Sequence, residues 1–117
     1  MKRIAIILIV TVLLVACSHK LSLNLSPSET FKLSTLSATT STCLIAPGSL
    51  QHKALENWLS ENQNGWQSTP ASYVPGTVVS GVGFTLNFVG SLAIANYSGG
   101  QYSRSTKPVD YEFLQCK

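Results

Sequence analysis

The spacing of hydrophobic residues divides this chain into three kinds of segment. Residues 4–16 form a low-polarity run that contains one Thr. Between residues 50 and 62, large apolar side chains recur at the spacing of one helical face. After that point, short apolar stretches alternate with glycine-containing turns, which is typical of antiparallel strands. The pattern therefore predicts an apolar leader, one α-helix and a β-rich C-terminal half.

The predicted helix over residues 50–62 has its own start and stop signals. Ser49 suits the N-cap, because its hydroxyl can accept a hydrogen bond from an early free N–H group. The apolar stripe consists of Leu55, Trp58 and Leu59, which Ala54 and Leu50 could extend, and the Asn-Gly pair after the helix ends it. This helix is therefore the natural cover for one face of a sheet.

The strands are predicted from alternation and turn residues on both sides of the helix. Before it, alternating Leu21, Leu23 and Leu25 would allow a first edge strand, alternation predicts a strand over residues 30–37, and the Ser/Thr run at 38–42 predicts a loop. After it, strands are expected at 77–80, 83–89, 92–97 and 101–105, with a last short strand at 111–114.

A two-residue turn at Gly90-Ser91 fixes the register of one predicted hairpin. It places Phe88 opposite Ala93, Leu86 opposite Ala95 and Phe84 opposite Tyr97, so that most large residues face small ones. A turn at Gly99-Gly100 would place Tyr97 opposite Tyr102. Together these elements predict an α+β fold, an antiparallel β-meander with one α-helix packed on one face.

The leader carries the most specific motif of the chain. Two basic residues, Lys2 and Arg3, precede an apolar run of 13 residues, which as a helix spans about 20 Å and is too short for a bilayer core of about 30 Å. The run ends in Leu14-Val15-Ala16-Cys17, which resembles a bacterial lipobox. The resemblance implies cleavage before Cys17, diacylglycerol on its sulfur and acylation of the new amino terminus.

The resemblance also implies a location. Ser18 follows the lipidated Cys, where an Asp would resemble an inner-membrane retention signal, so we expect the outer membrane with the protein facing the periplasm. The expected organisation is a signal peptide at 1–16, a lipidated tether at 17–27 and a single small domain at 28–117. The whole chain has 8 Lys and Arg against 5 Asp and Glu, but two of the basic residues lie in the leader. The near-neutral remainder argues against a nucleic-acid partner.

The number and spacing of the cysteines suggest a disulfide and not a metal site. Cys43 and Cys116 remain once Cys17 carries lipid, and an even pair in an oxidising compartment favours a disulfide over two free thiols. The chain has only two histidines and no CxxC or HxxxH spacing, so we expect no metal and no cofactor.

Catalytic residues are scarce. The alternative function is a small hydrolase that acts on cell wall or peptide. In it His52, which we expect to be exposed on the first turns of the helix, would act with Cys43, or with Asp110 and a Ser. The chain has no GxSxG elbow.

The favoured interpretation is therefore a non-enzymatic binding module with a protein partner in the envelope, such as an inhibitor, an immunity-type protein or a subunit of an envelope complex. Its candidate binding surface combines two aromatic residues near the end of the helix with the second face of the sheet, although both aromatics could instead fill the edge of the core. The candidate residues are Trp66, Tyr73, Val89, Leu92 and Ile94.

Overall fold

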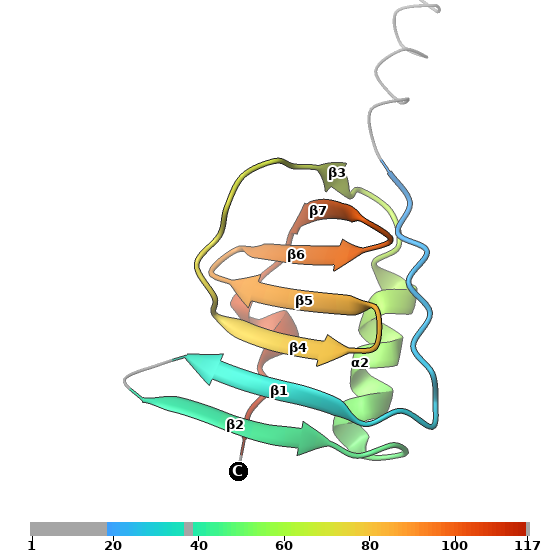
Figure 1. The fold of residues 1–117 in the computed structure, drawn as a ribbon, viewed down its shortest axis with the longest axis vertical. Coiled ribbons are helices and arrows are strands. Elements are labelled where there is room, and N and C mark those ends of the chain that lie inside the picture. The colour runs from blue at the N-terminus through green and yellow to red at the C-terminus, as the bar shows by residue number, and fades with distance from the viewer. Residues whose placement is uncertain (1–18, 37–38, 117) are drawn as a thin grey trace, which may run out of the picture.

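A computed structural model describes residues 19–36 and 39–116, so the lipobox and Cys17 lie outside the described residues. These residues form one antiparallel sheet of seven strands with a single α-helix, α2 (Leu50–Glu61), on one face, which confirms the predicted α+β fold (Figure 1). The strand order is β2-β1-β4-β5-β6-β7-β3. The strands are β1 (Phe31–Leu36), β2 (Thr40–Ile45), β3 (Gln67–Ser68), β4 (Thr77–Gly81), β5 (Phe84–Val89), β6 (Leu92–Tyr97) and β7 (Gly100–Ser105).

Helix α2 begins and packs as the sequence predicts. The Ser49 side chain accepts a hydrogen bond from the backbone N–H of His52, at 3.2 Å, and so caps the first turn. Leu55, Trp58 and Leu59 are buried against the sheet. Trp58 meets the Phe88 ring edge-to-face, with ring centroids 5.0 Å apart. The helix therefore covers the face of the sheet that carries the core.

The β5–β6 hairpin has the predicted register. Phe88 pairs with Ala93, Leu86 with Ala95 and Phe84 with Tyr97. These residues lie on the face toward α2, and small Ala side chains beside large ones let the helix approach the sheet.

The predicted register of the next hairpin is wrong by two residues. The turn lies at Ser98-Gly99, both with positive φ (50° and 75°), so Tyr97 pairs with Gly100 and Ala95 with Tyr102. Two residues with positive φ form a tight hairpin turn that matches the twist of the strands. A shift of two residues keeps every side chain on its predicted face. Tyr97 and Tyr102 therefore still touch, diagonally, with ring centroids 5.5 Å apart.

Two further predictions of local structure are wrong. The expected loop at 38–42 gives way at Thr40 to strand β2, because this Ser/Thr stretch pairs with the whole of β1. The expected strand at 111–114 is not formed: Tyr111 ends the 3-10 helix η1 (Pro108–Tyr111), and a turn at residues 112–113 follows. The Tyr111 ring packs on Phe88 and Leu114 is buried, so this C-terminal segment also covers the core face of the sheet.

The segment expected to be a tether is packed on the domain from His19 onward. Residues 19–30 run along the side of α2 before entering β1 (Figure 1). Leu21 belongs to the core with 2% of its surface exposed, and Leu23 and Leu25 pack against the core. The edge strand that their alternation would allow is not formed, since within residues 19–30 only His19 makes a β-bridge, and the three leucines instead add apolar surface to the folded body.

Candidate functional site

His52 is buried, so the prediction that it lies exposed on the helix is wrong. Only 1% of its surface is accessible, and its ring stacks on Phe31. The side chain points from the first turn of α2 into the space between the helix and the start of β1. The residue is therefore part of the core packing.

Both ring nitrogens of His52 already have partners. Nδ1 lies 2.7 Å from Oε1 of Glu56, one turn along the helix, and Nε2 lies 3.0 Å from the backbone carbonyl oxygen of Glu29. Each contact uses one of the two ring nitrogens, so neither nitrogen is left for another group. The imidazole therefore links α2 to the segment before β1 and is not poised toward solvent as a general base.

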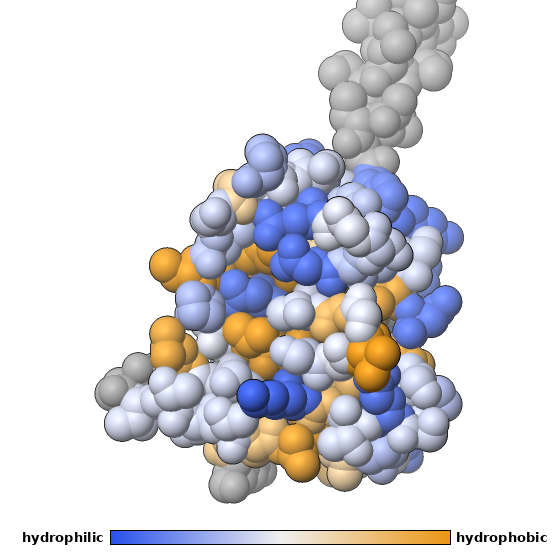
Figure 2. All heavy atoms as spheres, in the orientation of Figure 1, coloured by the Kyte–Doolittle hydropathy of each residue, from blue (hydrophilic) through white to orange (hydrophobic). Residues whose placement is uncertain are grey.

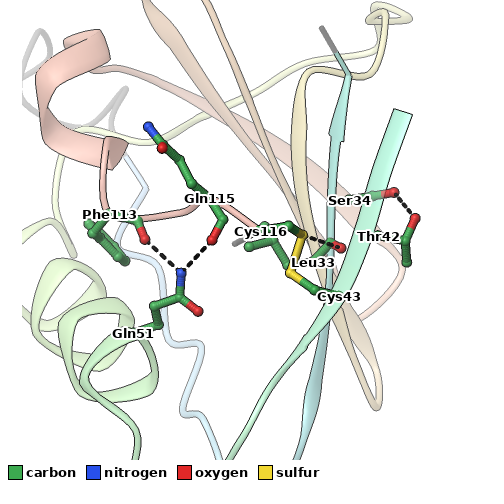
Figure 3. Close-up of a disulfide and its surroundings, with 8 residues drawn as sticks. All are labelled: Leu33, Ser34, Thr42, Cys43, Gln51, Phe113, Gln115 and Cys116. Atoms are coloured by element: carbon green, nitrogen blue, oxygen red, sulfur yellow. Dashed lines mark hydrogen bonds between the residues drawn. A yellow bond between two sulfur atoms is a disulfide. The ribbon is translucent and has the colours of Figure 1, made fainter. Parts of the chain in front are cut away.

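Cys43 and Cys116 form the predicted disulfide, with their Cα atoms 5.7 Å apart (Figure 3). The bond joins β2 to the C-terminal segment, 73 positions later. A sulfur in a disulfide is not a thiolate nucleophile. The two groups of the hydrolase hypothesis, Cys43 and His52, are thus both engaged in structural contacts.

Gln51 holds the same C-terminal segment to the helix. Its Nε2 donates to the backbone carbonyl oxygens of Phe113 and Gln115, each at 2.9 Å (Figure 3). The disulfide and this bidentate contact fix residues 113–116 from two sides. The C-terminal segment is therefore a rigid wall between α2 and β2.

A hollow of about 660 Å³ opens beside this wall. Two large apolar side chains on its rim are accessible to solvent, Leu44 with 70% and Leu50 with 86% of their surface exposed. Neither was among the predicted surface residues, and the suggestion that Leu50 extends the buried stripe of the helix is wrong, since its side chain is exposed. The hollow is lined by Cys43, Leu44, Leu50, Gln51, Ala54, Glu112, Phe113 and Gln115.

The hollow adjoins a free sheet edge. Strand β2 is the last strand of the sheet and pairs only with β1. In β1 the N–H of Leu36 donates to the carbonyl of Gly76 on the β4 side, and backbone groups alternate along an antiparallel strand. The main-chain groups of Thr40, Thr42 and Leu44 therefore point away from β1, toward the open edge.

Two of the predicted surface residues are buried, so that part of the prediction is wrong. Trp66 is fully buried, lies edge-to-face with Trp58 and donates its ring N–H to the carbonyl of Asn62. Ile94 has 1% of its surface exposed. Trp66 thus fills the core beyond the helix end, and neither residue can anchor a partner.

The sheet face opposite α2, which we call the outer face, is partly covered by residues 69–76. Asn87, the cross-strand neighbour of Ile94, donates to the Val74 carbonyl at 3.0 Å and accepts from the Gly76 N–H at 2.9 Å. Ile94, beside Asn87 on this face, is buried. Figure 2 shows hydrophobic residues in separate groups among hydrophilic ones on this face. The remaining predicted residues, Tyr73, Val89 and Leu92, are half-buried.

Neither metal-ligand clusters, nor membrane-spanning helices, nor similar proteins add to the description of this site. Within residues 19–36 and 39–116, no group of three His, Cys, Asp or Glu side chains could hold a metal ion. No helix in that part of the chain is long and apolar enough to cross a bilayer. No family model, curated protein sequence or solved structure matches the chain.

Proposed function

We propose that this chain is a lipoprotein of the bacterial outer membrane, anchored through Cys17 and facing the periplasm, which binds a protein partner without catalysing a reaction. The lipobox supports the anchor. The observation that supports the binding role is the pair of solvent-exposed leucines, Leu44 and Leu50, on the rim of the hollow beside the disulfide. We assign partner binding to this hollow, which we call the β2–α2 hollow.

Exposed leucines beside a concave surface are suited to a protein partner. Covering the side chain of a Leu removes apolar surface from water and contributes roughly 1.5–3 kcal/mol. The wall behind these side chains is held by the disulfide and by Gln51, so little conformational freedom is lost on binding. A rigid apolar rim is the arrangement in which a few residues contribute most of the binding energy.

The open edge of β2 supports the same role. A strand from a partner could pair with the outward main-chain groups of Thr42 and Leu44, and its side chains would then reach the β2–α2 hollow. Residues Thr40–Ile45 contain no charged residue and no Pro, the features that usually protect an edge strand from pairing.

Crosslinking and pull-down of the lipidated protein from its own envelope tests this function. We expect one stoichiometric protein partner, whose recovery falls at least tenfold in the Leu44→Glu, Leu50→Glu double variant. Val82→Glu is the matched control, since Val82 is 87% exposed in the turn between β4 and β5. No stoichiometric partner, or equal loss in the control, would contradict the assignment.

The lipid anchor has a separate test. Mass spectrometry of the protein from the membrane fraction should give an amino-terminal Cys17 with attached fatty acids. The Cys17→Ser variant should leave this fraction. An intact Met1, or a product without fatty acids, would contradict the anchor.

A further inference from the structure

The first described residues are tied to one end of the sheet. The backbone N–H of His19 donates to the Trp66 carbonyl at 2.6 Å, and the Trp66 N–H donates back to the His19 carbonyl at 3.2 Å. Trp66 is fully buried and directly precedes β3. His19 is thus paired to a rigid point of the core.

Three further contacts extend this docking. The His19 ring stacks on Tyr102 of β7, with ring centroids 4.5 Å apart and planes 8° from parallel. The N–H of Leu21 donates to the Gln63 carbonyl at 2.7 Å, and its side chain is buried. The N–H of Ser22 donates to the Tyr97 hydroxyl at 3.1 Å. The chain is therefore fixed to the body by three residues within a run of four, His19, Leu21 and Ser22.

The docked residues follow almost directly on the residue that the lipobox assigns to the lipid. Ser18 alone separates Cys17 from His19. Two residue steps of extended chain span at most about 7 Å. A lipid on Cys17 would therefore leave the point where His19 joins Trp66 within that distance of the bilayer surface.

We propose that the domain is held directly against the membrane in one orientation, with its β3 end toward the lipid headgroups and the β2–α2 hollow pointing into the periplasm. This proposal rests on the lipid anchor of the proposed function. The strands stack from β3, where the described chain enters, to β2 at the far end (Figure 1). Six strand spacings of about 4.8 Å place β2 roughly 29 Å from β3.

This orientation assigns a different partner to each end of the sheet. Gln67 and Ser68 of β3 and the side chain of Lys20 are exposed at the docked end, where phospholipid headgroups would meet them. The free edge of β2 lies at the opposite end, open to a protein in the periplasm. The width of the sheet thus keeps the partner site clear of the bilayer.

Energy transfer from a single dye to acceptor-labelled lipids tests the orientation. The lipidated protein is placed in vesicles of phosphatidylethanolamine and phosphatidylglycerol with a headgroup acceptor. The dye is attached at Gln67→Cys or at Thr42→Cys, both exposed positions. We expect at least threefold stronger transfer from position 67 than from position 42, and equal transfer from both would overturn the proposal.

Two variants separate docking from simple proximity. A 12-residue Gly-Ser linker inserted between Ser18 and His19 has a mean span of about 20 Å and should remove the difference between the two dye positions. His19→Pro deletes the N–H that donates to Trp66 and should weaken the difference. A difference that persists unchanged with the linker would overturn the proposal that the short link to Cys17 sets the orientation.

Mass spectrometry of the same samples separates this proposal from the one on which it rests. A protein that lacks fatty acids overturns both the anchor and the orientation. A lipidated protein with equal transfer from both positions overturns the orientation and leaves the anchor standing.

Discussion

The His52 imidazole lies nearly parallel to the Phe31 ring, with centroids 4.6 Å apart and an angle of 13° between the planes. This contact joins the first turn of α2 to the start of β1. The residue that looked most like a catalytic group is therefore a packing residue with two hydrogen-bond partners.

The first prediction is that His52→Ala lowers the stability of the domain. The change leaves a cavity beside Phe31 and an unpaired carbonyl on Glu29, so we expect the free energy of unfolding to fall by about 2–4 kcal/mol. Urea denaturation followed by Trp fluorescence measures it. The neighbouring exposed residue provides the control, since Lys53→Ala should change stability by less than about 0.5 kcal/mol. A fully stable His52→Ala protein would contradict the structural role.

The sequence located elements whose determinants are local. The Ser49 cap, the Gly90-Ser91 turn and the Leu55, Trp58 and Leu59 part of the helix stripe each depend on a few neighbouring residues, and all three are found as predicted. The β6–β7 register was predicted wrongly because glycine adopts positive φ most readily, which favoured a turn at Gly99-Gly100. The actual turn instead uses Ser98 at positive φ. The predicted turn therefore lies one residue after the actual turn at Ser98-Gly99.

Residues whose environment depends on distant segments were misjudged. His52 is buried by contacts with Phe31 and with the carbonyl of Glu29, 23 positions earlier. The β2–α2 hollow exists only because the C-terminal segment returns to Cys43. The pairing of β1 with β4, across more than forty residues, likewise has no local signal. Short-range periodicity cannot report such contacts.

The second prediction concerns the disulfide. Replacing Cys43 and Cys116 together with Ala should lower the free energy of unfolding by about 4 kcal/mol, because the bond closes a long loop in the unfolded chain. It should also loosen the wall of the β2–α2 hollow, so partner recovery should fall. Urea denaturation of the double variant beside the oxidised parent measures the first effect. Equal midpoints for the two proteins would contradict it.

The third prediction is that Ser98→Gly stabilises the domain. Ser98 is the only non-glycine residue of the described chain with positive φ, at 50°, and this conformation strains an L-residue. We expect a gain of about 0.5–1 kcal/mol in a thermal or urea melt. The same substitution at the other hairpin, Ser91→Gly, relieves no strain and should lower stability through chain entropy. Equal effects at both turns would contradict the argument.

The fourth prediction is that Asn87 fastens the segment 69–76 over the outer face of the sheet. Its side chain bonds both the Val74 carbonyl and the Gly76 N–H, and only 9% of the surface of the residue is exposed. Asn87→Ala leaves both backbone groups without these partners, so we expect a loss of about 2 kcal/mol and faster proteolysis within 69–76.

Asn96 offers a matched control on the same face, because it has the same side chain but is exposed on the neighbouring strand. Asn96→Ala should leave both the unfolding midpoint and the cleavage rate within 69–76 unchanged. Amide exchange at Ile94 adds a second readout, since release of the segment should accelerate exchange around this buried residue. If the two Asn variants behave alike, the segment is held by contacts other than those of Asn87, and the outer face is closed by its own packing.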